Sequence, residues 1–189
     1  GDILLTETEK RDTLALNKKY GKFLLVINAG GPVDLTPGLE VGNILVLSQL
    51  GVETGAVLAN LILGKSYPSG KLATTWATEE QYSHVGDFGE LEDTRYREGI
   101  YVGYRYFDTV GSIPTFPFGY GLSYTTFSVT AGEVTAEGEC ILVTVTIKNV
   151  GEYPGKETVQ LYVSVPAGRL DQPYQTLAAF AKTEELAPG

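Results

Sequence analysis

The chain has 189 residues, a formal net charge of −9 at pH 7 and a hydrophobic content of 43%. This is the composition of a globular protein with room for one large domain or two small ones. Because no run of Lys or Arg is present to neutralise phosphates, nucleic-acid binding is not expected. No apolar stretch approaches the roughly 20 residues of a transmembrane helix, so no membrane span is expected either.

The numbers of cysteines and methionines further limit the class of protein. Cys140 is the single cysteine, which excludes an intrachain disulfide and a zinc cluster built on cysteines. A lone cysteine is typical of a reducing compartment and favours the cytoplasm over export. Methionine is absent from the whole sequence, which predicts a processed product or an excised piece of a longer protein.

The first 76 residues alternate between helical and strand patterns. Thr6 and Glu9 have capping-box spacing and predict the start of a helix that ends with two lysines. Continuous apolar runs within residues 22–31 and 42–51, each closed by glycine, predict strands buried on both faces of a parallel sheet.

A second helix is predicted after the second strand, with its end at Gly64. Its apolar residues fall at helical spacing, and these are Val57, Leu58, Leu61 and Ile62. Strands and helices in this order predict part of an open α/β sandwich over residues 1–76.

The sequence pattern changes twice in the remaining chain, at residues 77 and 125. Residues 77–124 have neither helical nor strand period, are rich in Gly and Tyr, and are interpreted as a linker that carries functional loops. Residues 125–189 alternate with a period of two, most clearly in CILVTVTIKN, where Ile141, Val143, Val145 and Ile147 share one side. This pattern predicts a truncated antiparallel β-sandwich of immunoglobulin or fibronectin III type. The predicted fold class is therefore α/β plus all-β, with both domains partial.

Glu53 lies where the second strand turns into the second helix, between Gly51 and Gly55. Ligands of open α/β sheets bind at the carboxyl ends of strands, and glycines let the backbone approach a ligand closely. A carboxylate at a helix N-terminus is also favoured by the helix dipole without any function. The spacing alone leaves both interpretations open.

Other candidate residues give weaker indications of a functional site. We expect Lys71, in the turn PSGKL, to be a solvated lysine. His84 is the only histidine, and without a GxSxG elbow a serine-hydrolase triad is not supported. Gly30 and Gly31 lack the spacing of a phosphate-binding loop. Aromatic stretches can stack on sugars, but we expect those within 77–124 to pack the linker against its neighbours.

Four stretches, taken in chain order, resemble glycoside hydrolase family 3, the β-glucosidase family. The stretch GVETGAVLANLILGKSYPSGKL resembles the family's G-x-E-x-G helix opening, followed by its P-S-G-K-L turn. VINAGGPVDL resembles the strand and glycine turn ahead of it. YREGIYVGYRYFD and FPFGYGLSYTTF resemble the segments that lead out of the α/β sandwich. The remainder resembles the fibronectin III-like domain that follows.

The resemblance implies a retaining mechanism with an aspartate nucleophile on a (β/α)8 barrel and an acid/base glutamate on the α/β sandwich. By position the acid/base is Glu53, with Glu98 in YREG as the runner-up. The barrel and its nucleophile have no counterpart in this chain, so we expect the isolated chain to be inactive. No metal or organic cofactor is implied, and no individual substrate-binding residue is assigned.

The sequence therefore predicts a fragment of a retaining β-glucosidase that hydrolyses terminal β-linked sugars from glycosides or oligosaccharides. Its partners would be that substrate and the missing barrel of the same enzyme. The alternative is a non-catalytic carbohydrate-binding or scaffold module, in which Glu53 is only a helix-terminal charge. A basic limb in the pH profile of kcat/KM that disappears on mutation of Glu53 would favour catalysis.

Overall fold

The computed structural model describes residues 3–38, 40–82, 92–93 and 95–189. Helix α1 (Glu7–Lys19) begins at the predicted capping box. The Glu9 backbone N–H donates to Thr6 Oγ1 at 3.2 Å, and the Thr6 backbone N–H donates to Glu9 Oε2 at 2.7 Å. Lys18 and Lys19 occupy the last turn, where cations suit the helix dipole. The prediction of this helix is confirmed.

The parallel sheet consists of β1 (Leu25–Ile27) and β2 (Ile44–Val46), with Leu25 opposite Ile44. A 3-10 helix, η1 (Thr36–Gly38), lies between the two strands in sequence. The prediction of full burial on both faces is wrong, because only Ile27 among the strand residues is buried. Within the described residues the sheet has two strands, and this narrow sheet leaves most strand side chains half-exposed.

The second predicted helix is also present. A 3-10 helix, η2 (Gly51–Glu53), leads directly into α2 (Thr54–Ile62). Gly64 follows the helix with a φ of +66°, the left-handed conformation that ends many helices. Helix α2 has no buried residue although most of its side chains are apolar, and Ile62 is 62% exposed.

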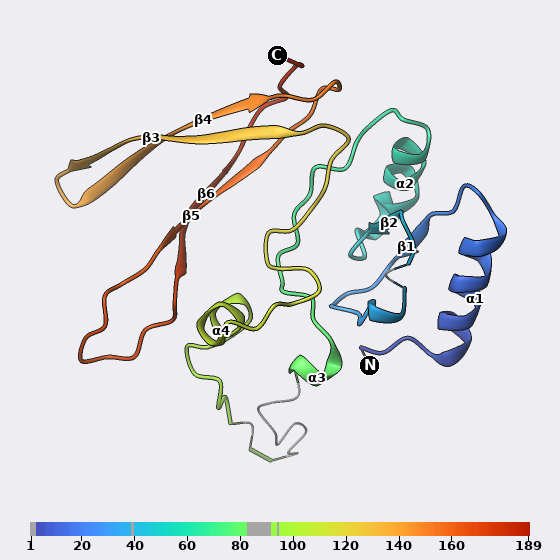
Figure 1. The fold of residues 1–189 in the computed structure, drawn as a ribbon, viewed down its shortest axis with the longest axis horizontal. Helices are drawn as coiled ribbons and strands as arrows, with labels where there is room; N and C mark the ends of the chain where they lie inside the picture. Colours follow the sequence, from blue (N-terminus) through green and yellow to red (C-terminus); the bar gives the residue numbers. More distant parts are fainter. Residues whose placement is uncertain (1–2, 39, 83–91, 94) are drawn as a thin grey trace.

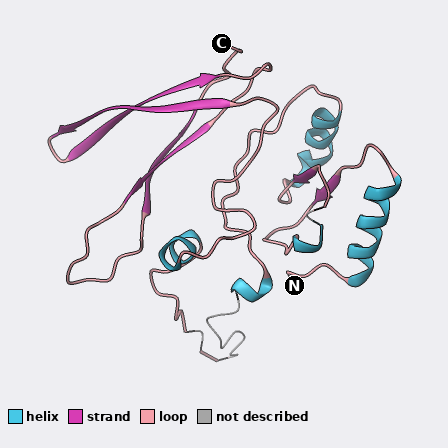
Figure 2. Ribbon diagram, viewed as in Figure 1, coloured by secondary structure: helices cyan, strands magenta, loops and turns pink. Residues whose placement is uncertain are grey.

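The described residues of the linker are mostly irregular, as Figure 2 shows, and they include two short helices, α3 (Glu79–Tyr82) and α4 (Tyr104–Val110). Its end folds back antiparallel to the segment after α2. Trp76 and Phe116 exchange two backbone hydrogen bonds of 2.8 and 2.9 Å. Trp76 joins Ile27 and Leu35 in the core, with Phe116 packed against them. The expectation that this aromatic stretch packs the linker is confirmed.

The C-terminal part forms two antiparallel hairpins, β3 (Phe127–Glu137) with β4 (Cys140–Asn149) and β5 (Thr158–Val163) with β6 (Thr176–Lys182). Figure 1 places both hairpins across the linker from α1 and α2. On β4 the predicted alternation holds for Val143, Val145 and Ile147, which are half-buried between exposed threonines. It is wrong for Ile141, which is 70% exposed because it lies next to the hairpin turn.

A buried asparagine ties the ends of this part together. Asn149 Oδ1 accepts hydrogen bonds from Thr125 Oγ1 at 2.7 Å and from the Gly151 backbone N–H at 3.1 Å. Its Nδ2 donates to the carbonyls of Tyr153 and Leu186 at 2.7 and 2.9 Å. All the hydrogen-bonding capacity of a buried amide is thereby used, so we assign Asn149 a structural role.

The molecule as a whole exposes much more surface than a compact protein does. Its accessible surface is 13406 Å². A compact monomer of this mass, 20.4 kDa, exposes roughly 8,800 Å². Large apolar side chains on α2 and on the β3–β4 hairpin contribute to the excess.

Candidate functional site

The turn between β2 and α2 has an unusual backbone. Ser48 and Gln49 have φ angles of 49° and 54°, and Gly51 follows with 74°. Left-handed backbone is ordinary for glycine, but for other residues it costs of order 1–3 kcal/mol and persists only where the surroundings enforce it. Such conformations cluster at binding and catalytic sites. The turn that leads to Glu53 is therefore a strained point of the α/β part.

Glu53 is the last residue of η2 and the N-cap of α2, and its side chain is exposed. Its carboxylate makes no capping hydrogen bond. The first turn is closed instead by Thr54 Oγ1, which donates to the Gly51 carbonyl at 2.7 Å. No described residue is recorded in a hydrogen bond or ion pair with the Glu53 carboxylate, so local structure does not explain the choice of Glu at this position.

The surroundings of Glu53 are apolar and open. Val52 is 99% exposed, and Leu50 is about half exposed. A Cβ atom added to Gly55 would meet nothing within 4 Å, so the backbone just after Glu53 is accessible to a ligand. An uncommitted carboxylate between apolar side chains and an open glycine is suited to chemistry in which a second surface covers it.

Gly30, at the carboxyl end of β1, lies against the same turn. A Cβ atom added to Gly30 would be 2.8 Å from Gln49 Oε1, whereas one added to Gly31 would meet nothing within 4 Å. A larger residue at position 30 would therefore displace the end of the Gln49 side chain from the place where the two loops meet. Sequence reasoning missed Gln49, because the closeness of these loops follows only from the parallel pairing of β1 with β2.

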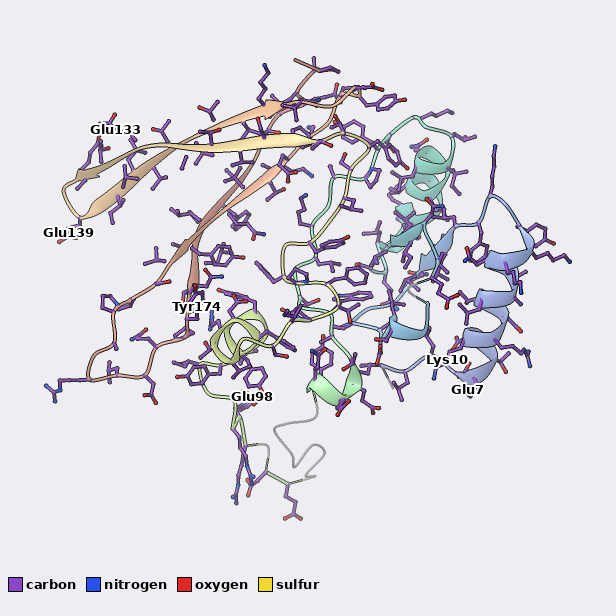
Figure 3. The ribbon with its side chains drawn as sticks, viewed as in Figure 1. Glu7, Lys10, Glu98, Glu133, Glu139 and Tyr174 are labelled. Atoms are coloured by element: carbon purple, nitrogen blue, oxygen red, sulfur yellow. The ribbon has the colours of Figure 1, made fainter. Side chains whose placement is uncertain are left out.

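Glu98, the runner-up, lies elsewhere. It is half-buried in a turn closed by the Tyr101 backbone N–H, which donates to the Glu98 carbonyl at 2.9 Å. Figure 3 shows Glu98 beside α4, whereas Glu53 belongs to the η2–α2 segment on the other side of the linker. The structure does not bring the two glutamates together.

The expectation of a solvated Lys71 is wrong. Its Nζ lies 2.8 Å from Glu157 Oε1 and donates to the Gly121 carbonyl at 2.7 Å. Lys71 therefore has a structural role that joins distant segments. His84 lies outside the described residues.

The described ranges contain neither a candidate metal centre nor a membrane-spanning helix. No group of three or more His, Cys, Asp and Glu side chains there is placed to hold a metal ion. None of the helices there is long and apolar enough to cross a membrane.

A parallel β-α element with a glutamate at its strand-to-helix turn, followed by antiparallel hairpins, defines an α/β domain joined to a fibronectin-like domain. Residues 1–124 match the glycosyl hydrolase family 3 C-terminal domain, and residues 157–189 match the fibronectin type III-like domain. The chain belongs to glycosyl hydrolase family 3, and the predicted resemblance and fold class are confirmed.

Similar proteins carry the name β-glucosidase. The β-glucosidase A of Butyrivibrio fibrisolvens is 40% identical over 212 residues, covering 100% of this chain and 26% of that protein. The thermostable β-glucosidase B of Acetivibrio thermocellus is 36% identical, with 98% and 25% covered. The structure of β-glucosidase 3B from Thermotoga neapolitana in complex with glucose superposes with a TM-score of 0.89 at 38% identity, covering 100% of this chain and 28% of that one. The chain thus spans about a quarter of the length of these relatives.

Proposed function

We propose that this chain supplies Glu53 as the general acid/base of a retaining β-glucosidase. The observation that carries the proposal is the state of Glu53, an exposed carboxylate at the carboxyl end of β2 that takes no part in local structure. The segment GVETG, which resembles the family's G-x-E-x-G opening, and relatives named β-glucosidase support the reaction class. Because the chain spans about a quarter of those relatives, the nucleophile would lie on another part of the enzyme.

The reaction would run in two steps. In the first, the Glu53 carboxylic acid protonates the glycosidic oxygen while an aspartate of the barrel bonds to the anomeric carbon. The bond from that carbon to the leaving oxygen breaks, which releases an alcohol and leaves a covalent glycosyl-enzyme. In the second, the Glu53 carboxylate takes a proton from water as the water oxygen attacks the anomeric carbon. The aspartate is released, and Glu53 is again protonated.

A general acid at neutral pH requires burial or a neighbouring negative charge. Within the described residues Glu53 is exposed, next to an almost fully exposed Val52. The barrel would supply the missing cover by closing over this apolar rim, with the substrate between the two domains. The isolated chain has neither this cover nor the nucleophile, so it should be inactive.

We assign residues 1–76 to the α/β sandwich domain, 77–124 to a linker and 125–189 to the fibronectin III-like domain of that enzyme. The pairing of Trp76 with Phe116 supports a linker whose end is packed on the α/β part. Substrate contacts are then expected from the turn at the carboxyl end of β2, beside Glu53.

The test compares Glu53→Ala with Glu98→Ala in the full-length enzyme. Removal of an acid/base should lower kcat on cellobiose about 10²–10⁴-fold. Aryl glucosides with good leaving groups should be less affected, and azide should restore turnover by forming a glycosyl azide. Glu98→Ala should show none of these signatures. Normal cellobiose hydrolysis by Glu53→Ala would favour the non-catalytic carbohydrate-binding or scaffold module.

A further inference from the structure

We propose that Gln49 is a positioning residue for Glu53 and acts through the contact of its side chain with Gly30. The inference rests on the catalytic role proposed above for Glu53. It assigns to the Gly30–Gln49 pair the task of fixing the turn that presents the carboxylate.

The contact involves the whole carboxamide of Gln49. A Cβ atom on Gly30 would be 2.8 Å from Gln49 Oε1, 3.3 Å from Cδ and 3.7 Å from Nε2. The amide group therefore lies directly over the Gly30 backbone, in space that any other residue at position 30 would fill. This contact joins the loop after β1 to the turn after β2.

The backbone of the turn needs such a contact. Gln49 has a φ of 54°, and the preceding Ser48 has 49°. Non-glycine residues in this region relax to other conformations unless the surroundings hold them. Gly30 lies against the end of the Gln49 side chain, and we assign to this contact the role of holding it.

The direction of α2 depends on the same turn. Neither η2 nor α2 has a buried residue, so apolar packing of their own side chains fixes their orientation only weakly. The chain passes from the turn at 48–51, where residues 48, 49 and 51 have positive φ, straight into η2, whose last residue is Glu53. A change in the turn therefore moves the carboxylate, and a displacement near 1 Å in an active site can lower the rate about 10²-fold.

The first experiment uses two neighbouring glycines of the full-length enzyme as a matched pair. Gly30→Ala places a methyl group against the Gln49 amide, whereas Gly31→Ala meets nothing within 4 Å. We expect Gly30→Ala to lower kcat on cellobiose about 10- to 100-fold with a smaller change in KM. Gln49→Gly, which tolerates the left-handed backbone but lacks the amide, should do the same. Gly31→Ala should retain the wild-type rate.

Two readouts separate positioning from a loss of folded protein. When the acid/base is misplaced, water attacks the glycosyl-enzyme slowly. Azide should therefore restore turnover of aryl glucosides by Gly30→Ala and Gln49→Gly. Partial unfolding would lower all rates and leave azide without effect. In the Glu53→Ala background, Gly30→Ala should cause no further loss, because nothing is left to position.

The possible results distinguish the positioning role of Gln49 from the acid/base role of Glu53. If Glu53→Ala is impaired but Gly30→Ala equals Gly31→Ala, the positioning role is overturned and the acid/base assignment stands. An equal loss from Gly30→Ala with and without Glu53 also overturns the positioning role alone. If Glu53→Ala hydrolyses cellobiose normally, both proposals are wrong.

Discussion

Lys71 Nζ lies 2.8 Å from Glu157 Oε1, and it also donates a hydrogen bond to the Gly121 carbonyl at 2.7 Å. The two side chains are only 17% and 18% exposed. Glu157 Oε1 accepts a second hydrogen bond, from the Thr158 backbone N–H at 2.7 Å. A single cation thus joins the turn after α2, the end of the linker and the start of β5.

Lys71→Ala should destabilise the protein by about 2 kcal/mol, because it leaves Glu157 partly buried without its cation. The matched control is Lys156→Ala, since Lys156 is 3.7 Å from a 99% exposed Glu184. A surface pair of that kind contributes about 0–1 kcal/mol. Urea unfolding of the two variants at low and high salt measures the difference. Equal, small effects would contradict a structural role for the Lys71 pair.

Gly121→Ala should destabilise the same junction without changing any charge. A Cβ atom at this position would be 2.3 Å from the Gly70 carbonyl oxygen, and a backbone atom cannot swing away as a side chain can. Overpacking of this kind costs about 1–3 kcal/mol. Gly70→Ala is the control, because a Cβ there meets nothing within 4 Å. Thermal unfolding should rank wild type and Gly70→Ala together, above Gly121→Ala.

These long-range contacts mark the limit of what the sequence predicts. The capping box of α1 was predicted because Thr6 and Glu9 interact within one turn. The environment of Lys71 was predicted wrongly because its partner, Glu157, is remote in sequence and no local pattern reports it. The exposure of Ile141 was not predicted for a related reason. Alternation with a period of two indicates which side of a strand faces the core, but not how much of that side other residues cover.

The candidate site was likewise predicted only in part from the sequence. The strand-turn-helix pattern and the glycines located Glu53 correctly at the β2–α2 turn. Its lack of a local hydrogen-bond partner could not be foreseen, because Glu at a helix N-terminus is compatible with either role. The packing of Gln49 on Gly30 required knowledge that β1 and β2 are adjacent and parallel.

Tyr67 should make stability sensitive to alkaline pH. Its hydroxyl donates to Glu185 Oε2 at 2.8 Å. Burial, followed by this hydrogen bond and the charge of Glu185, raises the pKa of Tyr67 to about 12. Since an unfolded tyrosine titrates near 10, the stabilising contribution is complete below about pH 10 and is lost as the pH rises through about 12.

The measurement is the difference in unfolding free energy between wild type and Tyr67→Phe from pH 8 to pH 12. Near pH 8 the variant should be less stable by about 1 kcal/mol, the value of one hydrogen bond. The difference should shrink above pH 10, because the ionised phenol no longer donates to Glu185. Taking the difference removes the titration of lysines common to both proteins. A constant difference across this range would contradict the assignment.

Gly55→Ala should stabilise the protein and impair the enzyme at the same time. Gly55 is an exposed residue near the start of α2, and a Cβ there meets nothing within 4 Å. Alanine in a helix is favoured over glycine by about 0.5–1 kcal/mol, so thermal unfolding should shift upward. If substrate lies against the backbone beside Glu53, the added methyl group occupies its space, and kcat/KM should fall about 10-fold or more. Gly21→Ala, also exposed and without neighbours within 4 Å, should leave kcat/KM unchanged. Full activity in a stabilised Gly55→Ala would mean that the open space beside Glu53 is not where the sugar binds.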